Sequence, residues 1–166
     1  GLNYWLYRAR YKYGKNLNLT APVDLSIELS SSCDLACVFC YHADPAKLPF
    51  KRGMMKFEIA QKAILEGAEI GVHSFKPNFR GESTLHPQFE AVTKFAKNLA
   101  SGSTYLERIT NSNFNFSNNR DSILSGLCNQ TKVKISLDSM IKSVLEKQRV
   151  KSNYEVIIKN IDDFYN

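Results

Sequence analysis

Four short strand-like segments alternate with longer helix-like segments, and this order constrains the fold of the chain more than any other feature. The strand-like segments span residues 23–29, 74–79, 105–110 and 133–137, and the helix-like segments span 56–70, 88–100 and 119–127, with further helical segments out to 164. Because helices between successive strands make tight hairpins unsuitable, the order predicts βα units and a parallel sheet. We therefore expect an α/β protein.

The strand-like segments alternate apolar and polar residues, whereas fully buried parallel strands usually form almost continuous apolar runs. The apolar members are Val23, Leu25, Ile27 and Leu29 in the first segment, Phe75, Pro77 and Phe79 in the second, and Val133, Ile135 and Leu137 in the fourth. Since the side chains of a strand point to opposite faces in turn, one face of the sheet should pack under helices and the other should be polar. A polar face suits the lumen of an open barrel, which carries its active site at the C-terminal ends of the strands.

Three of the four cysteines, Cys33, Cys37 and Cys40, lie in a C-x3-C-x2-C segment after the first strand. A closed iron–sulfur site uses four ligands, and a metal site with an open position can bind a ligand that reacts. The clustered thiols therefore indicate a catalytic metal site. The alternative is a zinc-binding interaction module in which His42 supplies the fourth ligand.

The cysteine segment resembles the cluster loop of the radical S-adenosylmethionine (radical SAM) enzymes, including the aromatic Phe39 before the third cysteine. The resemblance implies that the three cysteines hold a [4Fe–4S] cluster, whose fourth iron binds the amino and carboxylate groups of S-adenosylmethionine (AdoMet). Reductive cleavage of AdoMet would then give a 5'-deoxyadenosyl radical, which takes a hydrogen atom from the substrate. By the same resemblance, Phe39 shields the cluster and lies next to the adenine.

The segment after the second strand reads Asn-Phe-Arg-Gly-Glu-Ser-Thr-Leu-His-Pro and resembles the family loop that meets the amino group of AdoMet. Gly81 would allow the backbone to approach a ligand closely, and Glu82 can accept a charge-assisted hydrogen bond from an ammonium group. Arg80 and Ser83 depart from the glycine and proline usual in this loop. Arg80 is either tolerated there or helps to hold an anionic group of the substrate.

Two further strand ends resemble family segments. The fourth strand continues as Ile-Ser-Leu-Asp, similar to a family segment whose serine and aspartate lie close to the cofactor, and this similarity implies a cofactor role for Ser136 and Asp138. Their spacing of two places both on the polar face. The third strand ends in Ile-Thr-Asn-Ser, similar to the family's Thr-Asn-Gly, which implies that Asn111 lies at the mouth of the lumen. Asparagine at a strand end is also ordinary turn chemistry.

Radical SAM enzymes typically contain a partial barrel of six βα units, and only four fit into these 166 residues. We therefore predict a partial (β/α)6 TIM-like barrel with about the first four units present. Residues 1–20 would form a basic N-terminal extension, and residues 21–166 the N-terminal part of a truncated radical SAM core domain; an independent short protein is the alternative. Relatives that continue into a cysteine-rich SPASM or twitch-type domain often modify peptides or proteins, so a peptide is a candidate substrate. A catalytically inactive scaffold is a further alternative.

The composition argues against a membrane protein. No apolar run approaches the length of a membrane span, and clustered cysteines without a disulfide framework fit a reducing compartment. We therefore expect a cytoplasmic enzyme that receives electrons from a reductant such as flavodoxin or ferredoxin. The formal net charge of +6 is moderate, so the basic N-terminus is read as a solvated or docking segment rather than a nucleic-acid-binding arm. Cys128 stands apart and is expected to be a buried thiol.

Overall fold

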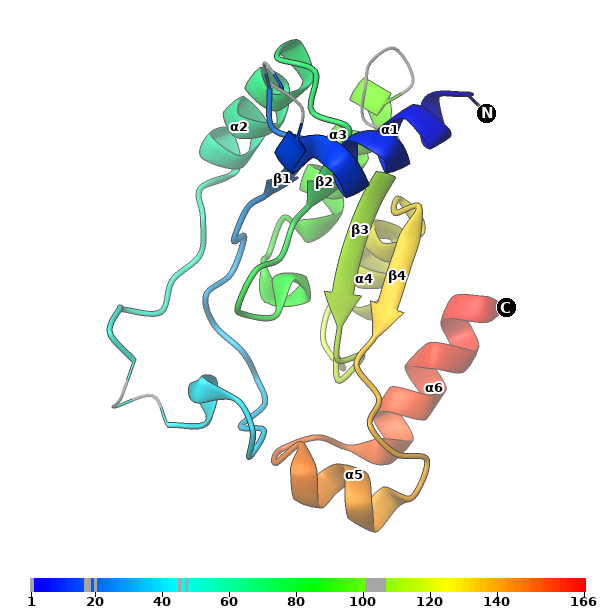
Figure 1. The fold of residues 1–166 in the computed structure, drawn as a ribbon. Coiled ribbons are helices and arrows are strands. Elements are labelled where there is room, and N and C mark those ends of the chain that lie inside the picture. Colours follow the sequence, from blue (N-terminus) through cyan, green and yellow to red (C-terminus); the bar gives the residue numbers. More distant parts are fainter. Residues whose placement is uncertain (1, 17–18, 20, 45, 47, 101–106) are drawn as a thin grey trace.

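The computed structural model describes residues 2–16, 19, 21–44, 46, 48–100 and 107–166 of the chain (Figure 1). The helices and strands follow in the order α1 (Leu2–Tyr13), β1 (Asp24–Ser26), α2 (Phe57–Glu69), β2 (Ser74–Lys76), α3 (Phe89–Ala100), β3 (Glu107–Ser112), α4 (Arg120–Cys128), β4 (Lys132–Ile135), α5 (Lys142–Gln148) and α6 (Tyr154–Tyr165). Short 3-10 turns include η2 (Tyr41–Ala43) and η4 (Ser83–Leu85). The predicted alternation of strands and helices is confirmed.

The four strands form one parallel sheet in the order β1-β2-β3-β4. β1 is short, but the chain beyond it stays beside β2, because the Ile27 N–H donates to the Lys76 carbonyl oxygen at 2.9 Å. The predicted α/β class and the partial barrel with four βα units are therefore confirmed.

The third strand lies further along the chain than its prediction. Residues 105–106 are outside the described residues, and β3 continues to Ser112. The Ser112 carbonyl oxygen accepts the Ser136 N–H at 2.8 Å, so pairing with the chain after β4 keeps this end extended. Asn111 consequently lies inside a strand rather than in a turn after one.

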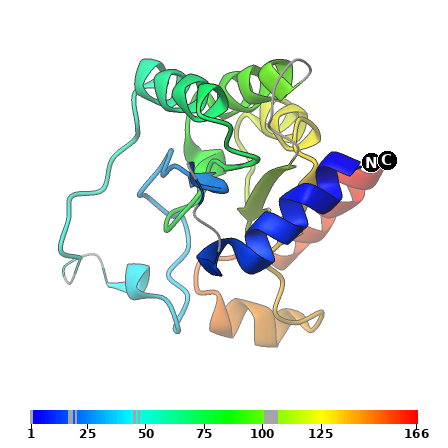
Figure 2. The ribbon, with the colours of Figure 1, turned by 45° about the horizontal axis from the view of Figure 1, so that its top comes forward.

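Helices α2, α3 and α4 cover one face of the sheet (Figures 1 and 2). The buried core there includes Ile27, Leu29, Phe75, Ala60, Ile64, Phe89, Val92, Ala96, Ile123 and Leu127. Most of the predicted apolar face therefore packs under helices as expected. Phe79 is 65% exposed, because β2 ends at Lys76 and the alternation no longer applies in the turn that follows.

The opposite face of the sheet carries polar side chains. Asn111 and Lys134 lie opposite each other on β3 and β4, and both are exposed. In Figure 1 this face is turned toward the viewer, with α3 and α4 behind the strands. This is the face that the alternating sequence assigns to the lumen of the barrel.

The predicted N-terminal extension contains helix α1, which crosses the N-terminal ends of the strands (Figures 1 and 2). Tyr7 anchors it: this residue is buried, its ring stacks on the His73 ring with 6.3 Å between centroids, and its hydroxyl donates to Asp24 Oδ1 at 3.4 Å. The aromatic side chains of Tyr4, Trp5, Tyr11 and Tyr13 are exposed. Arg10 of the same helix also reaches His73, with 3.5 Å between its Nη1 and the His73 Nε2. The division between extension and core domain stays a prediction.

Helices α5 and α6 follow β4, and α5 lies beyond the C-terminal ends of the strands (Figure 1). Leu145 of α5 and Ile157 of α6 are buried in the core. Asn153 caps α6, since its Oδ1 accepts the Val156 N–H at 3.1 Å. The chain between the two helices returns to the cysteine segment, which places residues 148–150 beside it.

The fold also bears on the predictions about Cys128 and about membrane-spanning segments. Cys128 is exposed, so the prediction of a buried thiol is wrong: α4 ends at this residue, and the helix buries the adjacent Leu127 instead. Within the part of the chain that the structure describes, no helix combines the length and the apolar character needed to cross a membrane.

Candidate functional site

The three clustered cysteines line one cavity of about 180 Å³ that is formed by the segments following the strands, here called the cysteine cavity. Its lining comprises Cys33, Leu35, Cys37, Phe39, Cys40, Asn78, Phe79, Arg80, Gly81, Glu82, Asn111, Asn113, Ser136 and Arg149. Among the site residues predicted from the sequence, all but Asp138 therefore lie around this cavity. The fold brings together segments that are up to 116 positions apart, from Cys33 to Arg149.

Backbone hydrogen bonds hold the cysteine segment on two sides. On one side the Ser31 N–H donates to the Gly53 carbonyl oxygen at 3.0 Å, so the returning segment before α2 runs alongside. On the other side the Ala36 N–H donates to the Val150 carbonyl oxygen and the Val38 N–H to that of Gln148, both at 2.9 Å. The loop that carries the thiols is thus held between the segment before α2 and the segment at the end of α5.

Burial disfavours the thiolate form of two cysteines in this loop, Cys33 and Cys37. Burial raises the pKa of Cys33 to about 12, and burial also raises the pKa of Cys37, although the Arg149 guanidinium partly opposes that rise. Within the described residues, no three histidine, cysteine, aspartate or glutamate side chains are grouped so that they could hold a metal ion. A bound metal would therefore have to draw the thiols together and displace their protons. The donor set fits an iron–sulfur cluster, because its natural ligands are cysteine thiolates.

His42, the fourth ligand of the zinc alternative, does not line the cysteine cavity. It is 2% exposed, and its ring packs against Tyr41 and Phe50 with centroid distances of 4.6 and 6.1 Å. Burial and the nearby Arg52 lower the pKa of this imidazole. The described arrangement therefore does not present His42 together with the three thiols.

Gly81 lies where two loops touch. A Cβ atom at this position would overlap the carbonyl oxygens of Ser30 and Ser32, and the adjacent Glu82 N–H donates to the Ser32 carbonyl oxygen at 2.8 Å. From the sequence, this glycine was expected to allow close approach of a ligand. The structure gives it a second reason, because the backbone of the cysteine loop itself occupies the space.

Glu82 carries a buried carboxylate at the edge of the cysteine cavity, with 6% of the residue exposed. Its Oε1 accepts the Thr84 hydroxyl at 2.8 Å, and its Oε2 accepts the Asn113 N–H at 2.9 Å. Burial raises the pKa of Glu82 to about 7, against the opposing effect of these hydrogen bonds. A cationic ligand would stabilise the ionised form, so the site is suited to an ammonium group.

Arg149 is the functional candidate that the sequence analysis did not select. Its guanidinium forms an ion pair with Asp138, with 2.7 Å between Nε and Oδ2, and its Nη1 lies 3.8 Å from the Cys37 sulfur. The same group lies over the Phe39 ring, 5.4 Å from the centroid. Asp138 itself is directed to this arginine rather than to the cavity. In the sequence, Arg149 is distinguished only by its position directly after residues 142–148, and this position is a weak indication of a functional role.

The remaining predicted residues lie at the rim. The Asn111 N–H donates to Asn78 Oδ1 at 3.2 Å, and Ser136 follows β4 directly. Arg80 stacks between two aromatic rings, with its guanidinium carbon 5.1 Å from the Phe79 centroid and 5.5 Å from that of Phe50. Both contacts keep this cation beside the cavity opening.

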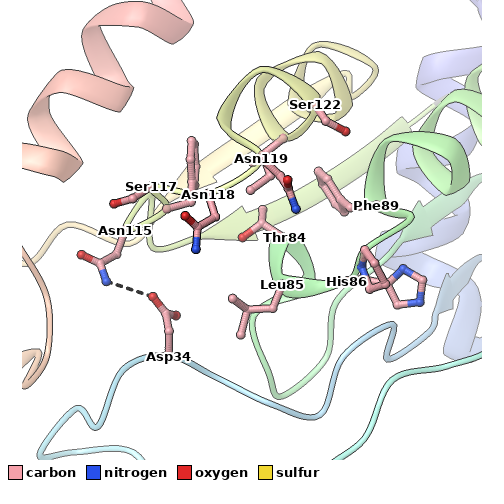
Figure 3. Close-up of a pocket in the computed structure, with 13 residues that line it drawn as sticks. Asp34, Thr84, Leu85, His86, Phe89, Asn115, Ser117, Asn118, Asn119 and Ser122 are labelled. Carbon is pink, nitrogen blue, oxygen red and sulfur yellow. Dashed lines mark hydrogen bonds between the residues drawn. The ribbon is translucent and has the colours of Figure 1, made fainter.

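A second cavity, of about 360 Å³, adjoins the cysteine loop at Asp34 and is here called the Asp34 cavity (Figure 3). Asp34 Oδ1 accepts Asn113 Nδ2–H at 2.8 Å, and its Oδ2 accepts Asn115 Nδ2–H at 2.9 Å, the contact dashed in Figure 3. The Asn115 Oδ1 in turn accepts the Asn153 N–H at 2.8 Å. Figure 3 shows Thr84, Leu85 and His86 on one side of this cavity and Asn119 and Ser122, from the start of α4, on another.

The hydrogen bonds of Asp34 with Asn113 and Asn115 could not be predicted from the sequence. The Asn- and Ser-rich composition after β3 indicates a loop, but it does not indicate which residue the loop binds. Asp34, Asn113 and Asn115 form the wall between the two cavities and tie the cysteine loop to the segment after β3.

Several solved structures share this fold. Native anSMEcpe with bound AdoMet matches with a TM-score of 0.68 and 19% sequence identity, over 87% of this chain and 41% of that one. Methylornithine synthase (PylB) gives a TM-score of 0.59 and 15% identity over 98% and 47% of the two chains, and TYW1 with a bound lysine-pyruvate adduct gives 0.58 and 17% over 95% and 58%. The chain thus spans 41–58% of the length of these structures. No family model and no curated protein sequence matches it.

Proposed function

We propose that this chain is part of the catalytic core of a radical SAM enzyme, with Cys33, Cys37 and Cys40 as ligands of a [4Fe–4S] cluster. The observation that carries the proposal is the cysteine cavity, where the three thiols meet Gly81 and Glu82 from the loop after β2. The shared fold with a structure that holds AdoMet supports it further. When bound, the cluster and AdoMet supply one-electron chemistry that the side chains alone cannot perform.

In this proposal Glu82 and Arg149 recognise the two charged ends of the methionyl group. The Glu82 carboxylate is buried and lacks a cation partner among the described residues, so it would accept hydrogen bonds from the ammonium group. Arg149 lines the same cavity beside Cys37 and would attract the carboxylate of AdoMet. Asp138 holds the guanidinium in place through its ion pair, which makes it a positioning residue.

Phe39, Asn111 and Ser136 would contact the nucleoside part of AdoMet. Phe39 presents an aromatic ring at the cavity and would pack against the adenine and keep water from the cluster. Asn111 and Ser136 contribute an amide and a hydroxyl that suit the ribose hydroxyl groups. The substrate is proposed to be a peptide or protein, and the electron donor a cytoplasmic reductant such as flavodoxin or ferredoxin.

Metal analysis after anaerobic reconstitution tests the proposal. The wild-type protein should contain about four irons and about four sulfides per chain, and replacing Cys33, Cys37 or Cys40 by alanine should abolish the cluster. Cys128→Ala is the matched control, since this exposed thiol lies outside the cavity lining. Zinc in place of iron would support the interaction module instead. An intact cluster whose electron paramagnetic resonance spectrum does not respond to AdoMet would support an inactive scaffold.

A further inference from the structure

An exposed hollow of about 620 Å³ lies beside the cysteine loop and is lined by Val38, Ser143, Val144, Lys147 and Gln148. We infer that this surface, here called the α5 face, is the docking site of a small acidic electron-transfer protein that reduces the cluster. The inference rests on the proposed function, because only a bound cluster needs an electron from outside. Three properties of the α5 face support the inference: its position, its apolar surface and its charge.

The position of the α5 face gives a partner direct access to a cluster ligand. Val38 lies in the hollow and is the chain neighbour of Cys37. The Val38 N–H also donates to the Gln148 carbonyl oxygen at 2.9 Å, so the hollow and the thiol-bearing loop form one connected surface. Since electron transfer slows steeply with distance, a donor must approach the metal closely, and a partner seated here is separated from Cys37 by a single residue.

The α5 face exposes apolar side chains that the described fold leaves uncovered. Val38 in the hollow is 65% exposed and Val144 is exposed as well, and Ile141, which directly precedes α5 outside the hollow, is 64% exposed. Met140 and Val150 add further exposed apolar surface at the two ends of α5. Exposed apolar side chains that gather around a hollow, as Val38 and Val144 do, are typical of interaction sites on soluble proteins.

The charges around the α5 face are basic once internal pairs are taken into account. Lys142 pairs with Glu155 at 2.6 Å, and Arg149 pairs with Asp138. The remaining nearby acid on α5, Glu146, is turned toward α6, where its Oε1 accepts the Tyr154 N–H at 3.0 Å.

Two lysines remain uncompensated. Within the described residues, Lys147 in the hollow and the exposed Lys151 have no ion-pair partner. An apolar centre with a basic rim complements an acidic partner, and steering by opposite charge speeds the encounter of such transient complexes. Electron-transfer complexes are also among the smallest protein interfaces, which suits one short helix and one loop.

Flavodoxin is the probe for this inference. Its binding to the reconstituted holoprotein would be measured by biolayer interferometry at several salt concentrations, for the wild type, Lys147→Glu and Val144→Ser. We expect Lys147→Glu to weaken binding about tenfold and to flatten the salt dependence, and Val144→Ser to weaken it about threefold. Lys94→Glu makes the same change of charge on the exposed part of α3 and should leave the affinity within about twofold of wild type.

Reduction by dithionite separates this inference from the proposed function. All variants should be reduced by dithionite at the wild-type rate, since this small reductant needs no docking surface, whereas stopped-flow reduction by reduced flavodoxin should slow in the order of the binding losses. If a cluster forms but wild-type holoprotein does not bind flavodoxin, or if the α5 variants bind it as well as wild type does, the docking inference is wrong and the proposed function stands. If no cluster forms, both are wrong.

Discussion

The cysteine cavity and the Asp34 cavity share a wall but use their polar groups in different ways. In the cysteine cavity, Glu82 holds a buried carboxylate without a cation partner among the described residues, and burial raises the pKa values of Cys33 and Cys37. These groups are held in forms that a bound cation or metal would change. The polar groups of this cavity could therefore form further interactions with a bound ligand.

In the Asp34 cavity, by contrast, the side chains of Asp34 and His86 already have their partners. His86 Nε2 lies 2.7 Å from the Met55 carbonyl oxygen, and its Nδ1 accepts the Gln88 N–H at 3.1 Å. Both oxygens of Asp34 accept amide hydrogens. The difference teaches that the same loops present reactive groups on one side and hold one another in position on the other.

The largest expected effect concerns Gly81, where the loops that build both cavities touch. Gly81→Ala should destabilise the protein by about 4 kcal/mol, because the new Cβ overlaps the carbonyl oxygens of Ser30 and Ser32. Urea denaturation would measure the loss. Gly53→Ala is the matched control, since a Cβ there meets no atom within 4 Å, and it should change the free energy of unfolding by less than about 0.5 kcal/mol. Equal effects of both substitutions would contradict the close contact between Gly81 and the backbone of the cysteine loop.

The next effect is a pH dependence that belongs to the cysteine cavity. The pKa of Glu82 is raised from 4.5 to about 7 in the folded protein. The stability associated with its protonated form is therefore fully present below pH 4.5 and is lost as the pH rises through about 7, by about 3 kcal/mol in total. Denaturation of the ligand-free protein between pH 4.5 and 8.5 would show this slope.

Glu82→Gln is the comparison for that slope, because the amide does not ionise. The variant should lack this part of the pH dependence, and saturating AdoMet should reduce it in the wild type by favouring the ionised carboxylate. A slope that persists unchanged in Glu82→Gln would show that another group causes it.

A somewhat smaller effect should follow from opening the wall between the cavities. Asp34→Ala leaves the side-chain amides of Asn113 and Asn115 without their acceptor, and we expect a loss of about 2 kcal/mol. The cysteine loop should also retain less iron after reconstitution. Asn118→Ala serves as the control, since this exposed residue lines the Asp34 cavity outside the wall. If both variants kept full stability and iron, the wall would have no positioning role.

The smallest effect on stability is expected for Arg149→Gln, which breaks an ion pair that is partly exposed. The cost should be about 1 kcal/mol, measured by thermal unfolding, but AdoMet affinity measured by calorimetry should fall by about tenfold or more. Lys142→Gln removes the exposed pair with Glu155 and should change neither quantity appreciably. A loss of stability without a loss of affinity would make Arg149 a purely structural residue.

The parts of the site that could be predicted from the sequence depend on local spacing. Cys33, Cys37 and Cys40 fall within eight residues, and the period of two along the strands placed Ser136 beside the lumen. Asp34 could not be predicted in the same way, because it meets Asn113 and Asn115 across 79 and 81 positions. Arg149 reaches Cys37 across 112 positions. Such contacts are set by the packing of whole βα units and leave no local pattern.

The fold shows the same limit. The order of strands and helices was predictable from periodicity, but helix α1 was not, because only Tyr7 among its aromatic residues is buried and a single buried residue produces no apolar stripe. Phe79 followed the strand pattern in the sequence and is exposed, because the strand ends before it. Local patterns therefore predicted the elements better than their ends.

The hydrogen bonds of the cysteine loop also bear on the time at which the metal can enter. The loop is synthesised before its partners at Asn113, Asn115 and residues 148–150, which lie about 75 or more positions further along the chain. Until those residues are synthesised, the thiols belong to a segment that lacks most of its supports, and contacts of such long separation form slowly. We expect the cluster to be inserted only after residues 148–150 have formed their hydrogen bonds with the cysteine loop. The time of metal binding should therefore follow the folding of this later segment rather than the synthesis of the cysteines.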